Sequence, residues 1–171
     1  DARALAVLDA ATARAGWATR RRAEGIGHGL AYARYKNTGA WCAVVAEVHA
    51  AERLRVRRLT IAVDVGLAVN PDGVVAQIEG GALQATSWAL LESAAPAHAG
   101  WDDYPVLRFA DVPELDVAVM PSEAPSLGAG EASLGPTGAA IANALFDALG
   151  VRVRDLPFTP ERIVAAMDGA A

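Results

Sequence analysis

The stretch P-S-L-G-A-G-E-A-S-L-G-P-T-G-A-A-I-A-N-A-L-F-D-A-L-G, residues 125–150, joins a loop of small residues to a well-marked helix. Pro136 suits the first helical position, because its missing N–H would have no partner there in any case. Gly150 suits the left-handed position that ends a helix. Between them one apolar stripe at i, i+4 and i+8 is formed by Ile141, Leu145 and Leu149. The spacing predicts a helix over residues 136–149, preceded by a loop that carries one acid, Glu131.

The loop around Glu131 has two interpretations. Its glycines, Gly128 and Gly130, allow the backbone to approach a ligand where a Cβ would block it. A general base benefits from apolar surroundings that disfavour its charged form, and the neighbours of Glu131 are apolar. A helix N-terminus favours the charged form instead, and Glu131 could simply stabilise that helix. Spacing alone leaves both interpretations open.

Composition sets bounds on the class of protein. The chain has 171 residues, of which 53% are hydrophobic, enough for one domain or two closely packed layers. A net charge of -5 argues against a surface that neutralises nucleic-acid phosphates. The single cysteine, Cys42, excludes a disulfide framework and an iron–sulfur cluster held by this chain, which needs about four thiolates. No metal is assigned to the histidines, which lack ligand spacing: His28, His49 and His98.

The remaining pattern predicts an α+β fold with no internal domain boundary. We expect a helix over 2–15, extended segments within 30–48 separated by a bend at 37–39, a strand over 53–65, a strand over 115–120 and a last helix that starts at 159. The short connection at Ala51-Glu52 favours antiparallel pairing of the segments on either side.

Two clusters have both a structural and a binding interpretation. The series Gly25-x-Gly27-x-Gly29 lacks the third-glycine spacing and the preceding strand of a dinucleotide fingerprint, so it indicates the beginning of a strand. The second cluster consists of four arginines, Arg53, Arg55, Arg57 and Arg58. It could bind an anionic cofactor, but a solvated strand face or a subunit contact is favoured.

A second informative stretch, residues 64–84, predicts a helix over 71–92. Asn70 and Pro71 form a helix-start pair. Two adjacent glycines inside a helix cost about 1 kcal/mol each relative to alanine. They indicate either close packing against another element or a ligand that lies against bare backbone. The apolar face of this helix carries Val74, Ile78, Ala82 and Ala89, and another face carries Gln77, Gly80, Gly81 and Gln84.

Taken together, these stretches resemble the C-terminal signatures of the molybdenum-binding large subunit in the xanthine dehydrogenase and aldehyde oxidase family. That family carries a G-x-G-E or V-G-E loop that leads into a helix with A-N-A. Before this loop in the sequence it carries the pattern D-x-G-x-x-x-N-P-x-x-x-x-x-Q-x-E-G-(G/A). W-D-D-Y-P-V-L-R at 101–108 and T-P-E-R-I at 159–163 are similar to the isoquinoline 1-oxidoreductase and nicotinate dehydrogenase branch. Ala85 departs from the glycine that many members carry there.

The resemblance implies a fold and a set of site residues. The fold is α+β, with a two-layer, largely antiparallel sheet covered by helices near 2–15, 71–92 and 136–149. We expect residues 1–171 to be a single C-terminal fragment of a molybdenum cofactor-binding domain, either cut from a longer chain or separately encoded. Glu131 is implied as the catalytic general base. The residues implied to lie beside the cofactor are Gln77, Gly80, Gly81, Gln84, Gly128 and Gly130.

The resemblance also implies a cofactor, partners and a reaction. The cofactor is molybdenum-molybdopterin in the cytosine dinucleotide form, shared with the remainder of the large subunit. Iron–sulfur clusters lie on a small [2Fe-2S] partner subunit. The reaction oxidises an aldehyde or an N-heteroaromatic substrate with oxygen derived from water. We expect the isolated chain to bind little or no cofactor and to have no turnover.

The sequence leaves one alternative class open, a non-catalytic assembly domain that contacts only partner subunits. Two other classes fit less well. A serine hydrolase is rejected because Ser126 and Ser133 lack a paired histidine and acid. A dinucleotide-binding domain is disfavoured because no strand–GxGxxG–helix unit is present.

Overall fold

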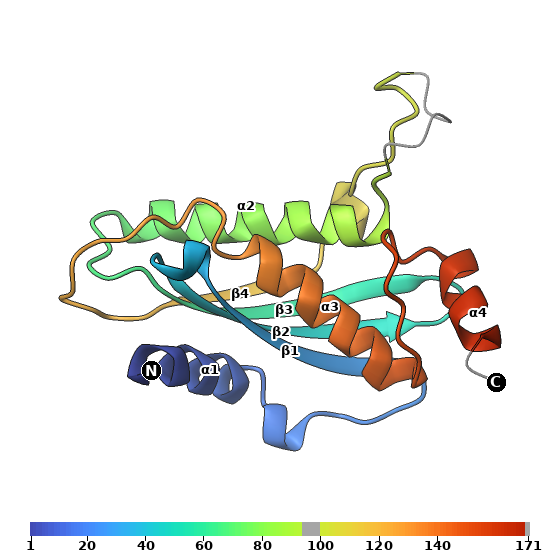
Figure 1. Ribbon diagram of the computed structural model, residues 1–171, viewed down its shortest axis with the longest axis horizontal. Coiled ribbons are helices and arrows are strands. Elements are labelled where there is room, and N and C mark those ends of the chain that lie inside the picture. Colours follow the sequence, from blue (N-terminus) through green and yellow to red (C-terminus); the bar gives the residue numbers. More distant parts are fainter. Residues whose placement is uncertain (94–99, 170–171) are drawn as a thin grey trace.

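The computed structural model describes residues 1–93 and 100–169, so that His98 lies outside the described residues. Its elements are α1 (Ala2–Arg14), η1 (Trp17–Thr19), β1 (Ile26–Arg34), η2 (Tyr35–Asn37), β2 (Trp41–Ala50), β3 (Leu54–Asp64), α2 (Pro71–Leu90), η3 (Phe109–Asp111), β4 (Glu114–Val119), α3 (Leu134–Leu149) and α4 (Pro160–Asp168). The predicted α+β class is confirmed (Figure 1). In the described ranges, no helix combines the length and the apolar character needed to cross a bilayer.

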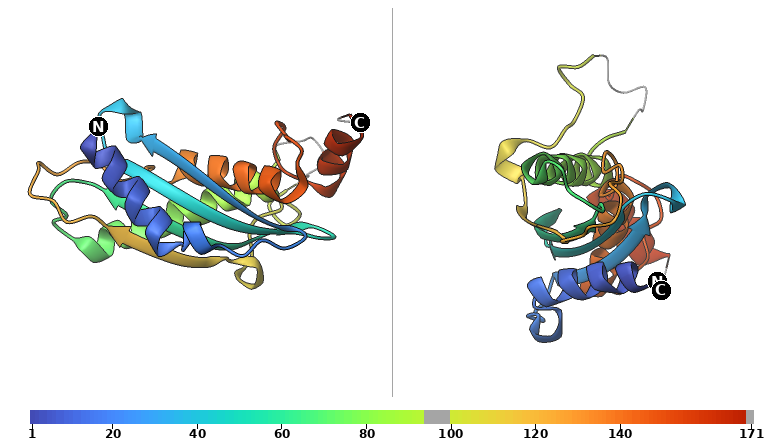
Figure 2. Two further views of the ribbon diagram at one scale, coloured as in Figure 1. Left: turned by 90° about the horizontal axis from the view of Figure 1, so that it is seen from below. Right: turned by 90° about the vertical axis from the view of Figure 1, so that its left-hand side faces the viewer.

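The sheet has four strands in the order β1-β2-β3-β4. The first three strands pair antiparallel, which confirms the pairing predicted across the connection at 51–52, and β4 returns parallel to β3 after α2. Helices α2 and α3 cover one face of the sheet, and α1 forms a further layer on the opposite face (Figures 1 and 2). The strands therefore have an apolar core on each side, which agrees with the nearly continuous burial of β2 and β3.

Glycines in β1 let α3 lie directly on the sheet. A Cβ added to Gly27 would lie 2.0 Å from the carbonyl oxygen of Ala144. One added to Gly29 would lie equally close, 2.0 Å, to the carbonyl oxygen of Ala140. Because these contacts are with helix backbone, no side-chain rotation can relieve them. This close approach explains Gly27 and Gly29, which lie in β1, whereas Gly25 precedes the strand with a positive φ of 70°. The prediction that the series marks the beginning of a strand is confirmed.

Two polar residues of α3 complete the hydrogen bonds of β1, which is an edge strand. Asn143, the asparagine of A-N-A, donates from Nδ2 to the carbonyl oxygen of Leu30 at 3.0 Å. The backbone N–H of His28 donates to Oδ2 of Asp147 at 2.9 Å. An unpaired strand edge is a template for association with other chains. Here the helix supplies partners for part of that edge.

An ion pair fixes α1 to the end of β3. Arg3 donates to both carboxylate oxygens of Asp64, from Nε at 2.6 Å and from Nη2 at 2.5 Å. These bonds hold the pKa of Asp64 below its ordinary value, against the opposing effect of burial and with support from the backbone N–H of Gly66. The aspartate of the D-x-G signature therefore has a structural role in this chain.

Replacing Asp64 with asparagine should lower the free energy of unfolding by about 1.5–3 kcal/mol at neutral pH, because hydrogen bonds to a charged group are lost. The folded-state pKa of Asp64 is lowered, so its stabilising effect is present above the unfolded pKa of about 3.9 and is lost as the pH falls through the folded value. The difference in the free energy of unfolding between the native chain and the variant should therefore shrink as the pH falls below about 4. Urea unfolding across this pH range measures the difference, and a difference that stays constant contradicts the role of the ion pair.

Helix α2 begins at the predicted residue, whereas α3 begins two residues before the predicted one. Asn70 accepts the N–H of Gly73 at 3.0 Å and caps α2, whose first residue is Pro71. Helix α3 begins at Leu134 rather than at Pro136, after a turn over 130–133. The proline is tolerated at the third position because the first four N–H groups of a helix have no intrahelical partner.

Candidate functional site

The two signature stretches meet where the chain leaves β3. The backbone N–H of Leu127 donates to the carbonyl oxygen of Val65 at 2.7 Å. Gly66 adopts a left-handed conformation with φ 69°, and a Cβ there would lie 2.1 Å from the carbonyl oxygen of Pro125. The glycine of D-x-G is thus required for the segment around Pro125 to pack against the end of the strand.

Helix α2 clamps the turn that carries Glu131. Gln77 donates from Nε2 to the carbonyl oxygen of Gly130 at 2.8 Å. Ser133 donates from Oγ to the carbonyl oxygen of Ile78 at 2.9 Å. A Cβ on Gly81 would lie 2.5 Å from that hydroxyl oxygen, so Gly81 is a packing position beneath the turn. The chain folds so that one helix holds the turn on both sides of Glu131.

Glu131 is exposed and has a partner from another part of the chain. The hydroxyl of Tyr35 donates to its Oε2 at 2.8 Å, although the two residues are 96 positions apart. Tyr35 begins η2, the turn between β1 and β2, which lies beside the beginning of α3 (Figure 1). In the sequence Tyr35 shows only a preference for strands, and no local pattern links it to the glutamate.

A cleft of about 400 Å³ lies beside this turn. Gln77 and Gly130 line it, together with backbone and apolar groups that follow β3 and with the side chain of Asn70. The lining includes Val65, Leu67, Ala68, Val69, Gly73, Val74, Ser126, Leu127 and Ala129. The wall is therefore mostly apolar, with two side-chain amides and no charged residue, and Glu131 lies beside the cleft and is not part of its lining.

The other predicted site residues do not line this cleft. Gly80 and Gly128 are exposed, and a Cβ added to either would meet no atom within 4 Å. Gln84 lines a separate hollow of about 380 Å³ beside Leu107 and Phe109. The structure thus brings together Gln77 and Gly130, and does not bring Gln84 to the same cleft.

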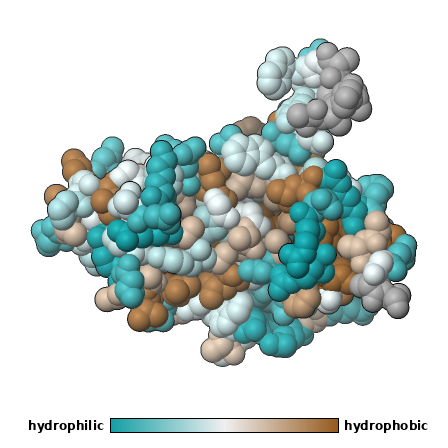
Figure 3. All heavy atoms as spheres, in the orientation of Figure 1, coloured by the Kyte–Doolittle hydropathy of each residue, from teal (hydrophilic) through white to brown (hydrophobic). Residues whose placement is uncertain are grey.

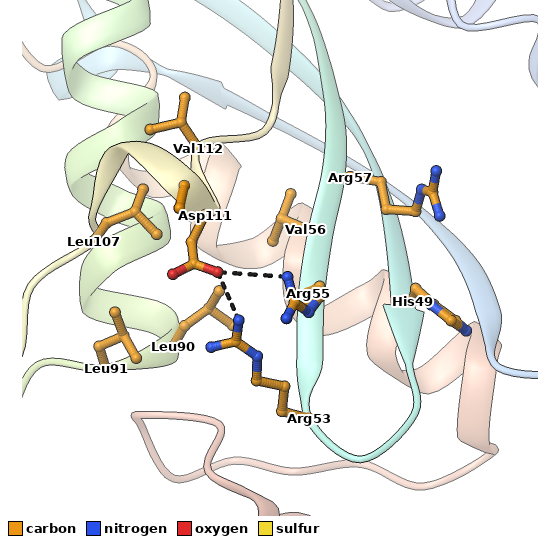
Figure 4. Close-up of a pocket in the computed structure, with 11 residues that line it drawn as sticks. His49, Arg53, Arg55, Val56, Arg57, Leu90, Leu91, Leu107, Asp111 and Val112 are labelled. Atoms are coloured by element: carbon orange, nitrogen blue, oxygen red, sulfur yellow. Dashed lines mark hydrogen bonds and ion pairs between the residues drawn. The ribbon is translucent and has the colours of Figure 1, made fainter.

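The arginine cluster lies at the opposite end of the sheet, where Arg53, Arg55 and Arg57 line a hollow of about 290 Å³ (Figure 4). Asp111 accepts from Arg53 at 2.7 Å and lies 3.5 Å from Arg55. Arg57 approaches Glu47 at 3.8 Å. The fourth arginine, Arg58, lies 3.7 Å from Glu114 and 3.5 Å from Asp116. Since each arginine has an acidic partner within this chain, the geometry favours a solvated strand face over an anion site.

Candidate metal ligands do not cluster in the part of the chain that the structure describes: no three His, Cys, Asp or Glu side chains gather there in a way that could hold an ion. Cys42 is buried in the sheet, and burial raises the pKa of its thiol to about 12. A thiol with such a pKa is unreactive at neutral pH. The groups that the site offers a ligand are therefore amides, open backbone and one carboxylate.

Comparisons with known proteins converge on one family. A family model described as a molybdopterin cofactor-binding domain matches residues 6–113. A nicotinate dehydrogenase polypeptide of Pseudomonas putida is 41% identical over 99% of this chain, and the beta chain of isoquinoline 1-oxidoreductase from Brevundimonas diminuta is 40% identical over 80% of it. This chain spans only 16% and 18% of those two proteins.

Solved structures give the same result. Aldehyde oxidoreductase from Desulfovibrio gigas superimposes with a TM-score of 0.69 and 28% identity, over 75% of this chain and 15% of that one. Quinoline 2-oxidoreductase from Pseudomonas putida 86 superimposes with a TM-score of 0.66 and 28% identity, over 75% of this chain and 18% of that one.

Proposed function

Because the chain belongs to the family of molybdopterin cofactor-binding domains of the xanthine dehydrogenase type, we propose that it forms one wall of the cofactor site in a larger molybdenum hydroxylase. In this proposal Glu131 is the general base. The observation that carries the proposal is the fixed turn at Gly130 and Glu131, which Gln77 holds from one side and Tyr35 from the other, beside a cleft.

The residues present fit a metal that is held by an organic cofactor. Gly130 and Gly128 leave backbone open, and Gln77 places a side-chain amide at the cleft. Cofactor sites combine apolar walls with a few placed amide and backbone groups, and both kinds of group line this cleft. We assign Gln77, Gly80, Gly128 and Gly130 to cofactor contact, and Gly81 to packing.

When bound, the molybdenum cofactor supplies a two-electron acceptor for oxidation of a substrate carbon. The chain's own contribution is proton transfer and positioning. Oε1 of Glu131 takes a proton from the water-derived nucleophile as it attacks the substrate. Gln77 donates to the carbonyl oxygen of Gly130, and this bond fixes the backbone from which the Glu131 side chain extends. Glu131 is exposed in this chain, so in this proposal the remainder of the large subunit excludes bulk water from that proton.

The rest of the enzyme lies outside this chain in the proposal. Large apolar side chains stand exposed on this domain, among them Val69 at 82% and Phe109 at 99%. The face that carries α2 and α3 also has hydrophobic residues interspersed among hydrophilic ones (Figure 3). Such groups are suited to contact with the remainder of the large subunit. We further propose the cytosine dinucleotide form of the cofactor and a small [2Fe-2S] subunit that accepts the electrons.

The test is an assay of the complete large subunit with its iron–sulfur partner against a panel of aldehydes and N-heteroaromatic compounds. We expect stoichiometric molybdenum and turnover of one of these classes. Residues 1–171 alone should retain no molybdenum, because most of the cofactor's contacts are missing. A complex replete with molybdenum that oxidises neither class, or stoichiometric molybdenum in the isolated chain, would refute the proposal.

A further inference from the structure

We propose that Tyr35 is a positioning residue for this site: its hydroxyl fixes Oε2 of Glu131 and leaves Oε1 to accept the proton. The inference rests on the proposed role of Glu131 as base and adds a residue that lies outside both signature stretches. The contact that carries it is the 2.8 Å hydrogen bond from the phenol oxygen to the carboxylate. A bond of this kind to a charged acceptor is stronger than one between neutral groups.

The geometry gives the two carboxylate oxygens different roles. Oε2 is occupied by Tyr35, whereas no residue of the described ranges forms a hydrogen bond with Oε1. A glutamate on an exposed turn otherwise samples many rotamers, and each would place the accepting oxygen elsewhere. One donor from a neighbouring element removes most of this freedom before substrate binds, which is the role of a pre-organised site.

Tyr35 is itself held in place. Its N–H donates to the carbonyl oxygen of Ala40 at 2.8 Å, and its own carbonyl accepts the N–H of Gly39 at 2.8 Å. A Cβ on Gly39 would lie 2.9 Å from that carbonyl oxygen and 3.2 Å from Cδ1 of the tyrosine ring. The ring also packs against the apolar core on the α3 side of the sheet. Because Tyr35 has these further contacts, its hydroxyl restricts the position of the more mobile carboxylate of Glu131.

The backbone and the side chain of the base are therefore fixed from different elements. Gln77 of α2 holds the backbone at Gly130, and Tyr35 of η2 holds the side chain of Glu131. Removing the tyrosine hydroxyl should leave the turn in place and release only the carboxylate. This separation makes the role of Tyr35 testable apart from folding and cofactor binding.

The experiment compares Tyr35→Phe, Glu131→Gln and the double variant in the complete enzyme with its partner subunit. The matched control is Tyr32→Phe, which removes a hydroxyl from β1, three residues before Tyr35. For Tyr35→Phe we expect kcat to fall by about 10-fold to 100-fold, with KM and molybdenum content within twofold of the native enzyme. In the Glu131→Gln background the same change should have little further effect on the single-turnover rate of cofactor reduction, because the two residues act as a unit.

The outcomes separate this inference from the proposed function. If Glu131→Gln is inactive while Tyr35→Phe matches the native enzyme, the positioning role is overturned and the proposed base stands. If Tyr35→Phe lowers the rate by the same factor in the native enzyme and in Glu131→Gln, the effect of Tyr35 is a general structural one, and the inference is overturned. Full activity of Glu131→Gln removes the base itself, and the inference with it.

Discussion

Replacing Gly29 with alanine is expected to destabilise this domain by about 3 kcal/mol or more, at the upper end of what overpacking costs. The added Cβ would lie 2.0 Å from the carbonyl oxygen of Ala140 and 2.3 Å from the N–H nitrogen of Ala144. Both atoms belong to the backbone of α3, so relief requires the whole helix to move away from β1. That movement would also lengthen the bonds by which Asn143 and Asp147 complete the strand edge.

The matched control is Gly138→Ala, in the helix that Gly29 contacts. A Cβ at Gly138 would meet no atom within 4 Å. Alanine there should raise the stability by about 0.5–1 kcal/mol through helix propensity alone. Urea or thermal unfolding of the two variants gives the comparison. A stability of Gly29→Ala within 0.5 kcal/mol (about the size of a neutral surface change) of the native chain contradicts the packing of α3 on β1.

The sequence predicts most of the fold because its signals are local. The Asn70-Pro71 pair and the apolar stripe of 136–149 place α2 and α3 to within two residues. The strand over 53–65 is β3, and the bend at 37–39 lies in the turn between β1 and β2. The residue pattern puts the start of β1 at Leu30 instead of Ile26, because glycine has little preference for strands. What makes those glycines part of a strand is the helix that arrives more than a hundred residues later.

The site is less accessible to such reasoning. Gly80 and Gly81 look alike in the sequence, yet one is open and the other is covered by Ser133. Helical spacing predicts that Gln84 shares a face with Gln77, but Gln84 lines another hollow together with residues 106–109. The bond between Tyr35 and Glu131 depends on the turn after β1 meeting the turn before α3, and no periodicity encodes that meeting.

Replacing Glu131 with glutamine in the complete enzyme should lower kcat by about 10²- to 10⁴-fold, the range that a general base contributes. The amide has the size of the carboxylate, and its oxygen can still accept the hydroxyl of Tyr35, so the turn should keep its place. It cannot accept a proton at neutral pH. The contacts assigned to the cofactor lie on Gln77 and on the glycines, so molybdenum content should not change.

A matched control separates the base from the charge of the loop. Glu123 is an acid that precedes Glu131 in the same connection between β4 and α3. Glu123→Gln makes the same chemical change outside the cleft lining. It should leave kcat within twofold of the native enzyme. A large loss in this control would assign the effect to the net charge of the segment.

The most direct measurement is the turnover per molybdenum atom, determined on the same preparations of native enzyme and of Glu131→Gln. The account predicts a loss of at least about 10²-fold at unchanged molybdenum content. Equal turnover at equal molybdenum content would contradict it and would leave the chain as an assembly domain around a cofactor site whose base lies elsewhere.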